Sequence, residues 1–336
     1  MHHNTIAVIL AAGKGTRMKS NRAKVLHEVF FKPMLHHVLD AVIGAKIEQI
    51  AVIVGHQRKK VLASIDQYAH SPVIQEEQLG TGHAVLCAKT VCEESRHVMI
   101  LCGDTPLIRS ETLQEMVKVH QQTNGVVTLM TTILDDPFGY GRVICDDEGN
   151  ITKIVEQKDA NDKQRAIREI NTGIYLVERE FLFNALQQVG TDNSQGEVYL
   201  TDIIAIAGKC GHKVHKFLHT RSIDVLGVNS RVELAQAHAE LQMRHNRTVM
   251  LSGVTMYSPA TILLDPASNI GRDTIINAGV QVTGSSIIGQ HTLLETGVVL
   301  QKCTVGKEAV IGANSVLRNC TVEEEEHIPP LTYKVG

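Results

Sequence analysis

The pattern of hydrophobic and polar positions divides the chain into two parts. Up to about residue 225, short apolar runs that suit buried strands, such as residues 50–54, alternate with segments in which apolar side chains recur every three or four residues. Leu35, Val38, Leu39, Val42 and Ile43, for example, would share one face of a helix. This alternation predicts an α/β domain with parallel strand pairing and helices on the sheet faces.

After about residue 250, the hydrophobic positions recur every six residues. They lie at Ile270, Ile276, Val282, Ile288, Leu294 and Leu300 and then, after one-residue slips, at Val305, Ile311, Leu317, Val322 and Ile328. Neither an α-helix nor an isolated strand has this period, whereas a hexapeptide solenoid does. We therefore predict a left-handed parallel β-helix with triangular coils, about three of which fit between residues 270 and 328.

Local patterns set the expected boundaries. Ile-Gly or Val-Gly pairs recur at 270–271, 288–289, 305–306 and 311–312, where we expect tight corners. The glutamates at 323–326 would be a solvated cap over the last coil, and Pro329 and Pro330 would end it. Residues 231–247, rich in Ala, Leu, Gln and Glu, predict a helix. We expect an α/β domain over 1–230, a connecting helix over 231–250 and a short β-helix over 251–336.

Composition narrows the class of protein. A chain of 336 residues exceeds the size at which one hydrophobic core usually stops growing, which agrees with two domains. The formal net charge of -3 gives no global electrostatic reason to bind nucleic acid or anionic membrane. The N-terminus lacks a cleavable signal pattern, and no apolar run approaches the roughly 20 residues of a spanning helix, so we expect a cytoplasmic protein. Seven cysteines without a CxxC pair indicate neither a disulfide framework nor a thiolate zinc site.

A glycine-interrupted loop follows the first apolar run, within residues 6–24. Gly13 and Gly15 would allow positive φ angles and bring backbone amides close to a ligand. The spacing fits neither the Walker A motif nor the dinucleotide-binding fingerprint. Cationic side chains in and after this loop would attract an oxyanion, and they are Lys14, Arg17 and Lys24. The loop therefore predicts local phosphate recognition.

Two further segments carry candidate chemistry. Asp104 comes just after the apolar run 98–101, and the carboxyl ends of strands in open α/β sheets form the usual ligand crevice. Its carboxylate is a candidate ligand for Mg²⁺, which prefers one or two carboxylates together with substrate phosphate oxygens. A second glycine-rich turn at 78–83 precedes a segment with helical character at 84–89, and its free amides could bind a ring or a base.

Several motifs together resemble a known family. They are LAAGKGTRM, Lys24, EQLGTGHA at 77–84, GD at 103–104, GYGR at 139–142, IVEQKDA at 154–160, EINTG at 169–173, EVYLTDII at 197–204 and GVN at 227–229. Over residues 5–250 the chain resembles the uridylyltransferase domain of the bacterial bifunctional enzymes that make UDP-N-acetylglucosamine. The resemblance implies a Rossmann-like nucleotidyltransferase fold. It also implies a reaction of UTP with N-acetylglucosamine 1-phosphate that needs Mg²⁺ and releases pyrophosphate.

The resemblance also implies a role for each matching residue. The nucleotide would be bound by Leu10, Ala11, Ala12 and Gly13, with Gln75, Gly80 and Thr81 at the uracil and Gly103 nearby. Arg17 and Lys24 would hold the triphosphate and stabilise the charge that develops on pyrophosphate. Asp104 and Asn229 would hold Mg²⁺. The amino sugar would be contacted by Gly141, Glu156 and Asn171.

The chain departs from the family pattern at three places. Cys102 stands where the family commonly has tyrosine, and Ala23 stands where it usually has proline. We expect these changes to alter affinity or substrate preference more readily than chemistry. The predicted β-helix is shorter than that of the bifunctional relatives, so we expect no acetyltransferase activity. Because related β-helices pack as trimers, we expect a homotrimer.

The sequence leaves three alternatives open. The enzyme could use another sugar 1-phosphate or another nucleoside triphosphate, because sequence does not fix the shape of a pocket to within one substituent. The solenoid could be a hexapeptide acyltransferase, for which His291 is the central candidate base. The chain could also be a non-catalytic subunit that binds a nucleotide sugar.

Overall fold

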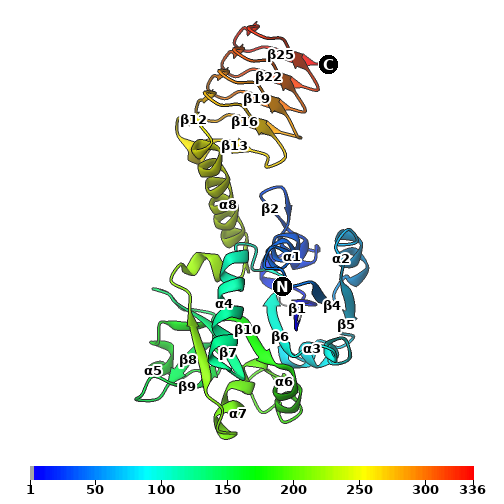
Figure 1. Cartoon of the computed structure of the whole chain (residues 1–336), viewed down its shortest axis with the longest axis vertical. Helices are drawn as coiled ribbons and strands as arrows, with labels where there is room; N and C mark the ends of the chain where they lie inside the picture. Colours follow the sequence, from blue (N-terminus) through cyan, green and yellow to red (C-terminus); the bar gives the residue numbers. More distant parts are fainter. Residues whose placement is uncertain (1–3) are drawn as a thin grey trace. The chain divides into compact units, whose positions relative to one another are not determined.

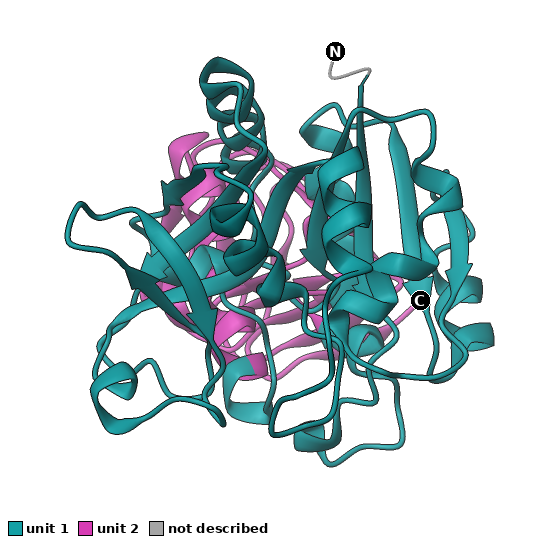
Figure 2. Cartoon of the chain, turned by 90° about the horizontal axis from the view of Figure 1, so that it is seen from below, with its two compact units in different colours: residues 1–28, 32–233 teal, residues 29–31, 234–336 magenta. Residues whose placement is uncertain are grey.

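The computed structural model describes residues 4–336, which form two compact units (Figures 1 and 2). The first unit ends at Glu28 and resumes over Lys32–Glu233. The second takes the short segment Val29–Phe31 together with Leu234–Gly336. Within the described residues, no helix is both long enough and apolar enough to cross a membrane.

A mixed sheet forms the centre of the first unit. Its main path runs in the order β11 (Val214–Leu218), β7 (Val127–Ile133), β10 (Glu169–Glu178), β6 (His97–Cys102), β1 (Thr5–Ala11), β4 (Gln49–Val54) and β5 (Ser71–Ile74). The antiparallel pair β8 (Arg142–Cys145) and β9 (Ile151–Val155) joins it through β10. Strand β1 pairs in parallel with both β4 and β6, which makes it a central strand buried on both faces.

The predicted parallel pairing does not hold for one central strand. Strand β10 runs antiparallel to both of its neighbours, β6 and β7. A parallel connection needs a crossover of a dozen or more residues, usually a helix. The chain instead reaches β10 from the β8–β9 pair through the four-residue helix α5 (Asp162–Arg165), and β8 pairs antiparallel with β10.

Helices cover both faces of the sheet, as predicted. The longer ones are α1 (Met34–Gly44), α2 (Arg58–Ser64), α3 (Thr81–Cys87), α4 (Ser110–Thr123), α6 (Arg179–Leu186) and α7 (Ile203–Lys209). Short 3-10 turns lie at η1 (Thr16–Met18), η2 (Lys24–Leu26), η3 (Thr90–Cys92), η4 (Leu200–Asp202) and η5 (Ser222–Val225). Alternate residues of β1 enter two separate buried clusters, one with α1 and α4 and the other with α3, α6 and α7. These two clusters are the hydrophobic layers expected of an α/β domain.

Helix α8 (Arg231–Leu251) begins at the end of the first unit and continues into the second. Within the second unit, Phe30 packs against this helix, with ring centroids 5.9 Å from His238 and 5.7 Å from His245. Phe30 lies between the short strands β2 (Glu28–Val29) and β3 (Lys32–Pro33), and its backbone amide donates a 3.2 Å hydrogen bond to Nδ1 of His238.

The predicted left-handed β-helix forms the rest of the second unit. One face stacks β12 (Thr255–Met256), β15 (Ile275–Ile276), β18 (Leu293–Leu294), β21 (Val310–Ile311) and β24 (His327–Ile328). The next stacks β13 (Leu263–Leu264), β16 (Gln281–Thr283), β19 (Val299–Gln301), β22 (Val316–Arg318) and β25 (Tyr333–Val335). The third stacks β14 (Asn269–Ile270), β17 (Ile287–Ile288), β20 (Thr304–Val305) and β23 (Thr321–Val322), and the turn η6 (Pro259–Thr261) lies between β12 and β13. The six-residue series supplies the inward side chains, which form one buried cluster.

Two details of the β-helix differ from the sequence expectation. The solenoid does not end at Pro329 and Pro330, because β25 follows them and pairs with β22. The prolines lie in a corner, where no ladder hydrogen bond is required of their nitrogens. The glycines that follow an inward Ile or Val do not have positive φ angles, so glycine is needed there for another reason. A Cβ on Gly289 would lie 2.5 Å from the backbone nitrogen of Lys307 in the next coil, so these glycines permit close stacking.

Candidate active site

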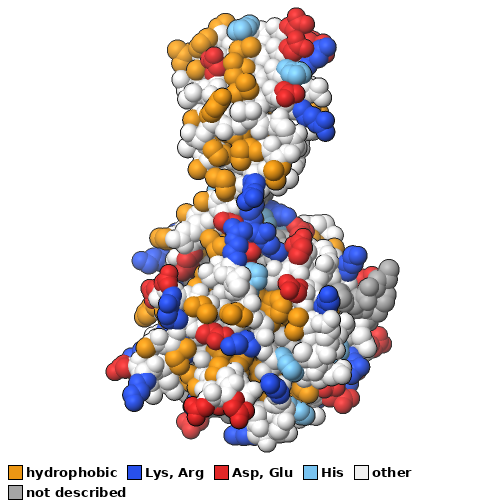
Figure 3. Space-filling model, turned by 60° about the vertical axis from the view of Figure 1, so that its left-hand side comes forward, with side chains coloured by type: hydrophobic (Ala, Val, Ile, Leu, Met, Phe, Trp, Pro, Cys, Tyr) orange, Lys and Arg blue, Asp and Glu red, His pale blue; other side chains and the backbone are white. Residues whose placement is uncertain are grey.

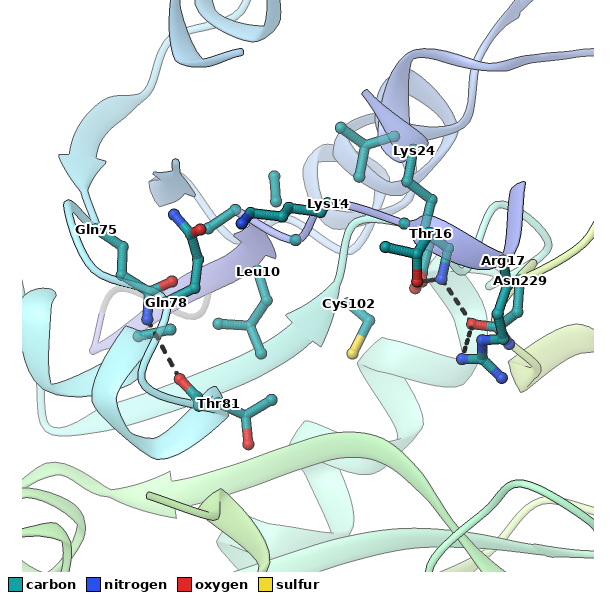
Figure 4. Close-up of a pocket in the computed structure, with 18 of the residues that line it drawn as sticks. Leu10, Lys14, Thr16, Arg17, Lys24, Gln75, Gln78, Thr81, Cys102 and Asn229 are labelled. Atoms are coloured by element: carbon teal, nitrogen blue, oxygen red, sulfur yellow. Dashed lines mark hydrogen bonds and ion pairs between the residues drawn. The ribbon is translucent and has the colours of Figure 1, made fainter. Parts of the chain in front are cut away.

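A pocket of about 690 Å³ opens in the first unit at the carboxyl ends of β1 and β6 (Figure 4). This is the edge at which open α/β sheets usually bind ligands, and the volume lies in the range of small-molecule sites. Its lining includes most of the predicted site residues, namely Leu10, Ala11, Ala12, Gly13, Arg17, Lys24, Gln75, Gly80, Thr81, Asp104 and Asn229. The fold therefore brings together residues that are up to about 220 positions apart in the sequence.

The loop after β1 shapes one wall of this pocket. Gly15 has a φ of +63°, and a Cβ on it would lie 2.5 Å from the Cβ of Lys24. Glycine is thus required at this position both for the backbone angle and for the approach of the Lys24 stem. Gly13, for which we also predicted a positive φ, does not have one, and a Cβ there would meet nothing within 4 Å. Its backbone lines the pocket without the left-handed conformation.

Two cations and two oxygen ligands converge at one end of the pocket. The Lys24 ammonium contacts the carboxylate of Asp104 and donates a 2.7 Å hydrogen bond to Oδ1 of Asn229. Nη2 of Arg17 donates to the same Asn229 oxygen, also at 2.7 Å. Arg17 and Lys24 line the pocket together with Asp104 and Asn229 (Figure 4). The two cations can attract a phosphate chain.

The same cluster fits a divalent cation. Oxygens of Asp104 and Asn229 already approach one positively charged group, the Lys24 ammonium, so they converge on a common point. The backbone amide of Val228 donates a 2.8 Å hydrogen bond to the backbone oxygen of Asp104, which holds the two segments in this arrangement. The described residues contain no group of three or more His, Cys, Asp or Glu side chains suited to a metal. A Mg²⁺ ion here would thus draw its remaining ligands from phosphate oxygens and water, as such ions commonly do.

The opposite end of the pocket is built around the turn before α3. Gly80 has a φ of +110°, and a Cβ on it would lie 2.5 Å from the backbone oxygen of Val198. Gln75 is buried, and its Nε2 donates a 3.3 Å hydrogen bond to the backbone oxygen of Gly80. The Thr81 hydroxyl accepts a 3.2 Å hydrogen bond from the amide of Leu200. These contacts hold a polar surface of fixed shape that could bind a planar base.

A second group of predicted residues lies outside this lining. The backbone amide of Asn171 donates a 2.9 Å hydrogen bond to the backbone oxygen of Gly141. A Cβ on Gly141 would lie 3.3 Å from Oε1 of Glu156. Burial raises the pKa of the Glu156 carboxyl. A Cβ on Gly139 would lie 4.0 Å from Nη1 of Arg17, so the loop before Gly141 runs close to the phosphate end of the pocket.

Gly103 also lies outside the lining. It is buried, and its backbone amide donates a 2.9 Å hydrogen bond to the backbone oxygen of Leu10, which joins the ends of β1 and β6. A contact between Gly103 and substrate stays a prediction. A Cβ on it would lie 3.1 Å from that same oxygen, which explains why glycine suits the position.

Lys14, Gly15 and Gln78 also line the pocket, and they belong to the two glycine-rich segments in which the sequence predicted ligand contacts. The lining residues for which no contact was predicted are Thr16, Val25, Ala84, Cys102 and Glu197. A sequence signal existed for Thr16, Ala84 and Glu197, because they lie within motifs that carry the family resemblance. Cys102 is a free thiol, as are the other cysteines of the described chain. Burial, with a further effect from Asp104, raises the pKa of Cys102 to about 12. The thiol therefore stays protonated near neutral pH and is a poor nucleophile.

Comparisons with known proteins agree with this geometry. Residues 6–240 match the family model described as nucleotidyl transferase. A protein of Desulfotalea psychrophila named bifunctional protein GlmU is 52% identical over 323 residues, which cover 96% of this chain and 95% of that protein. Proteins of the same name from Heliobacterium modesticaldum and Exiguobacterium sibiricum are 42% and 44% identical, covering 98% and 92% of this chain and 72% and 69% of their own lengths.

Proposed function

The chain belongs to the nucleotidyl transferase family, among relatives named bifunctional protein GlmU, and from this premise we propose that it transfers UMP from UTP to N-acetylglucosamine 1-phosphate. The products would be UDP-N-acetylglucosamine and pyrophosphate. The family identifies the chain as a nucleotidyltransferase enzyme, and its relatives support sugar-phosphate uridylyltransferase activity. Magnesium dependence and the identity of both substrates are part of our proposal.

The observation that carries the proposal is the contact cluster of Arg17, Lys24, Asp104 and Asn229. Nucleotidyl transfer requires the attacking phosphate and the α-phosphorus to be aligned, and it requires negative charge to be neutralised. The cluster supplies cations and metal-compatible oxygens at one end of a pocket that is large enough for a nucleotide. No protein nucleophile is needed, which agrees with the protonated state of Cys102.

In the proposed reaction, an oxygen of the sugar phosphate attacks the α-phosphorus of UTP, and the bond to the bridging oxygen of the β-phosphate breaks. Arg17 and Lys24 would bind the phosphate chain and stabilise the negative charge that grows on the leaving pyrophosphate. Asp104 and Asn229 would hold Mg²⁺, which supplies further neutralisation of phosphate charge when bound. With substrate present, we expect the Lys24 ammonium to exchange its contact with Asp104 for phosphate oxygens.

The remaining predicted residues would position the two substrates. The turn that contains Gly80 and Thr81, together with the buried Gln75, would bind the uracil through backbone and amide groups. The group of Gly141, Glu156 and Asn171 would contact the amino sugar, because it adjoins the loop that reaches Arg17. A carboxylate suits sugar hydroxyls, since it accepts several hydrogen bonds in fixed directions.

A second candidate keeps the chemistry and changes one substrate. Cys102 lines the pocket, and its side chain is small compared with an aromatic ring. The space beside it would admit a differently substituted nucleotide or sugar 1-phosphate, because hydrophobic or steric differences alone give only about 10–200-fold discrimination. This candidate predicts the same dependence on Lys24 and Asp104 with a different preferred pair of substrates.

The test is pyrophosphate release with Mg²⁺ across a matrix of four nucleoside triphosphates and several sugar 1-phosphates. We expect turnover confined to UTP with N-acetylglucosamine 1-phosphate, and we expect Lys24→Ala and Asp104→Asn each to lose at least about 10²-fold in kcat. Exposed Lys60→Ala and Asp66→Asn are matched controls that should keep wild-type rates. Turnover with another pair would support the second candidate. No turnover with any pair in folded protein would overturn both.

A further inference from the structure

The Gln57 side chain links two backbone groups of the segment just before Lys24. Its Oε1 accepts a 3.3 Å hydrogen bond from the amide of Ala23, and its Nε2 donates to the backbone oxygen of Asn21. The oxygen and the nitrogen of the Gln57 side-chain amide therefore both bind the same segment, in which Ala23 lies 34 residues earlier in the chain. Gln57 itself does not line the pocket.

The backbone at Gln57 takes a conformation that most residues avoid. Its φ is +53° and its ψ is 34°, in the left-handed region, and it directly precedes α2 without capping that helix through its side chain. Such a conformation in a residue other than glycine costs free energy and persists when surrounding contacts fix it. One such contact is adjacent, because the amide of His56 donates a 3.2 Å hydrogen bond to the backbone oxygen of Ala12 in the pocket wall.

Ala23 depends on this hydrogen bond for its orientation. Its φ of -55° and ψ of 136° are angles that proline would also adopt, but alanine does not restrict φ in this way. Ala23 is buried, and its amide would lack this partner without Gln57. Lys24 follows directly, and its ammonium must reach Asp104 and Asn229 from this point of the backbone.

We propose that Gln57 is a positioning residue that acts through Lys24. The amide of Gln57 fixes residues 21–23 and so sets the direction from which the Lys24 side chain enters the pocket. The effect on turnover rests on the proposed function, because it assumes that Lys24 stabilises charge on the phosphates. Loss of one or two hydrogen bonds to the segment should lower kcat by about 3- to 10-fold, with a smaller change in the KM for UTP.

The decisive kinetic test is a double-mutant cycle with Gln57→Gly. This variant removes the amide and relieves the left-handed backbone, so a loss of rate would not be explained by new strain. We expect the 3- to 10-fold loss in otherwise wild-type protein and no further loss in a Lys24→Ala background. An equal loss in both backgrounds would overturn the proposal. Asn124→Gly is the matched control, because Asn124 is an exposed residue with a φ of +45° that should show no rate effect.

A rescue variant provides the second kinetic arm. Proline at position 23 would restrict φ to the angle already present and would not need the lost hydrogen-bond partner. Ala23→Pro combined with Gln57→Gly should therefore recover most of the kcat lost by Gln57→Gly alone. A double variant no faster than Gln57→Gly, in folded protein, would contradict the proposed role.

Hydrogen exchange separates failure of this proposal from failure of the proposed function. In the free protein, Gln57→Gly should speed amide exchange in residues 21–24 and leave the distant strand β7 unchanged. Unchanged exchange in residues 21–24 would overturn the link between Gln57 and this segment, whatever the enzyme turns over. Faster exchange in a protein with no turnover on any substrate would support the link and refute the proposed function.

Discussion

The half-buried carboxyl of Glu156 combines a stability cost with a proposed role. Burial raises the pKa of Glu156 above its ordinary value of 4.5, so the folded state favours the protonated carboxyl. Because the pKa is higher in the folded state, the contribution of the Glu156 carboxyl to stability is complete at low pH and is lost as pH rises through the folded pKa. Ionisation of Glu156 at neutral pH therefore lowers the stability of the fold.

We predict that Glu156→Gln raises the melting temperature near pH 7.5 and that this gain disappears toward pH 4. The same variant should raise the KM for the sugar 1-phosphate more than the KM for UTP, because Glu156 lies with Gly141 and Asn171 in the proposed sugar group. Thermal unfolding at the two pH values and steady-state kinetics check both parts. A variant that is less stable at neutral pH, or that affects only the KM for UTP, would contradict the assignment.

His120 provides a pH test of the fold at the opposite edge of the sheet. It is buried, and its ring nitrogens contact the Thr128 hydroxyl at 2.8 Å and His97 at 3.1 Å. Burial, with smaller effects from His97 and His215, lowers the pKa of His120 from 6.5 to about 4. The neutral ring is favoured in the folded state, so its contribution to stability is present above pH 6.5 and is lost as pH falls toward 4.

We predict that the unfolding free energy of the wild type falls by of order 2 kcal/mol through this group between pH 7 and pH 4.5. His120→Gln should show a shallower pH dependence in urea unfolding, whereas the exposed control His212→Gln should keep the wild-type slope. Identical slopes in all three proteins would show that another group is responsible.

The sequence allowed prediction of side chains whose chemistry is recognisable on its own. Lys24 and Asp104 have the charge and the position after a strand that a phosphate site needs, and the structure brings them into contact. Gln57 could not be found in this way, because its role depends on a left-handed backbone angle and on a contact with Ala23, far away in the sequence. No local pattern of residue types encodes such a contact.

At the scale of elements, the beginning of α8 is coupled to the proposed metal site. The Glu233 carboxylate accepts a 3.0 Å hydrogen bond from the backbone amide of Ser230 and another from the backbone amide of Asn229. In return, the Ser230 hydroxyl accepts a 3.2 Å hydrogen bond from the backbone amide of Glu233. This reciprocal arrangement has the form of a capping box. It fixes the backbone of Asn229, whose side-chain oxygen contacts Lys24.

We predict that Glu233→Ala lowers the unfolding free energy by about 1 kcal/mol and raises the Mg²⁺ concentration needed for half-maximal activity. Glu233→Gln keeps an acceptor oxygen and should recover most of both effects. Urea unfolding and a Mg²⁺ titration of turnover are the measurements. If Glu233→Ala loses stability but keeps the wild-type Mg²⁺ response, the capping box does not act on Asn229.

Elements with strong periodicity could be predicted, whereas their partners could not. The six-residue series identified the inward positions of the β-helix, because its period matches no other regular structure. The direction of β10 could not be read in the same way, since a buried strand has the same hydrophobic pattern in parallel and antiparallel pairing. The stacking role of Gly289 was also hidden, because it arises from the neighbouring coil.

At the scale of the whole molecule, the outer surface of the β-helix carries apolar side chains (Figure 3). The outward positions Ile275 and Ile287 are 37% and 52% exposed, although each alternates with a buried isoleucine. Exposed apolar surface of this kind commonly marks an association surface. A homotrimer that forms through the β-helix stays our prediction, because a closed ring would cover such positions in every copy.

We predict a mass of three chains in solution by light scattering coupled to gel filtration. Ile287→Glu should shift the mass toward the monomer without unfolding the protein, while the polar control Gln281→Glu on an exposed strand position should not. A monomeric wild type would refute the trimer. A trimeric Ile287→Glu variant would show that the β-helix face that contains β17 is not the contact between chains.

In the proposed reaction, the pocket joins the α-phosphorus of UTP to a sugar phosphate, and ³¹P NMR of one reaction mixture detects the new bond. With UTP, N-acetylglucosamine 1-phosphate, Mg²⁺ and enzyme, we predict loss of the sugar-phosphate and UTP resonances and matched growth of UDP-sugar and pyrophosphate resonances. Lys24→Ala, assayed beside the wild type, should show almost none of this change. Unchanged substrates, or UTP hydrolysed while the sugar-phosphate signal persists, would contradict the account.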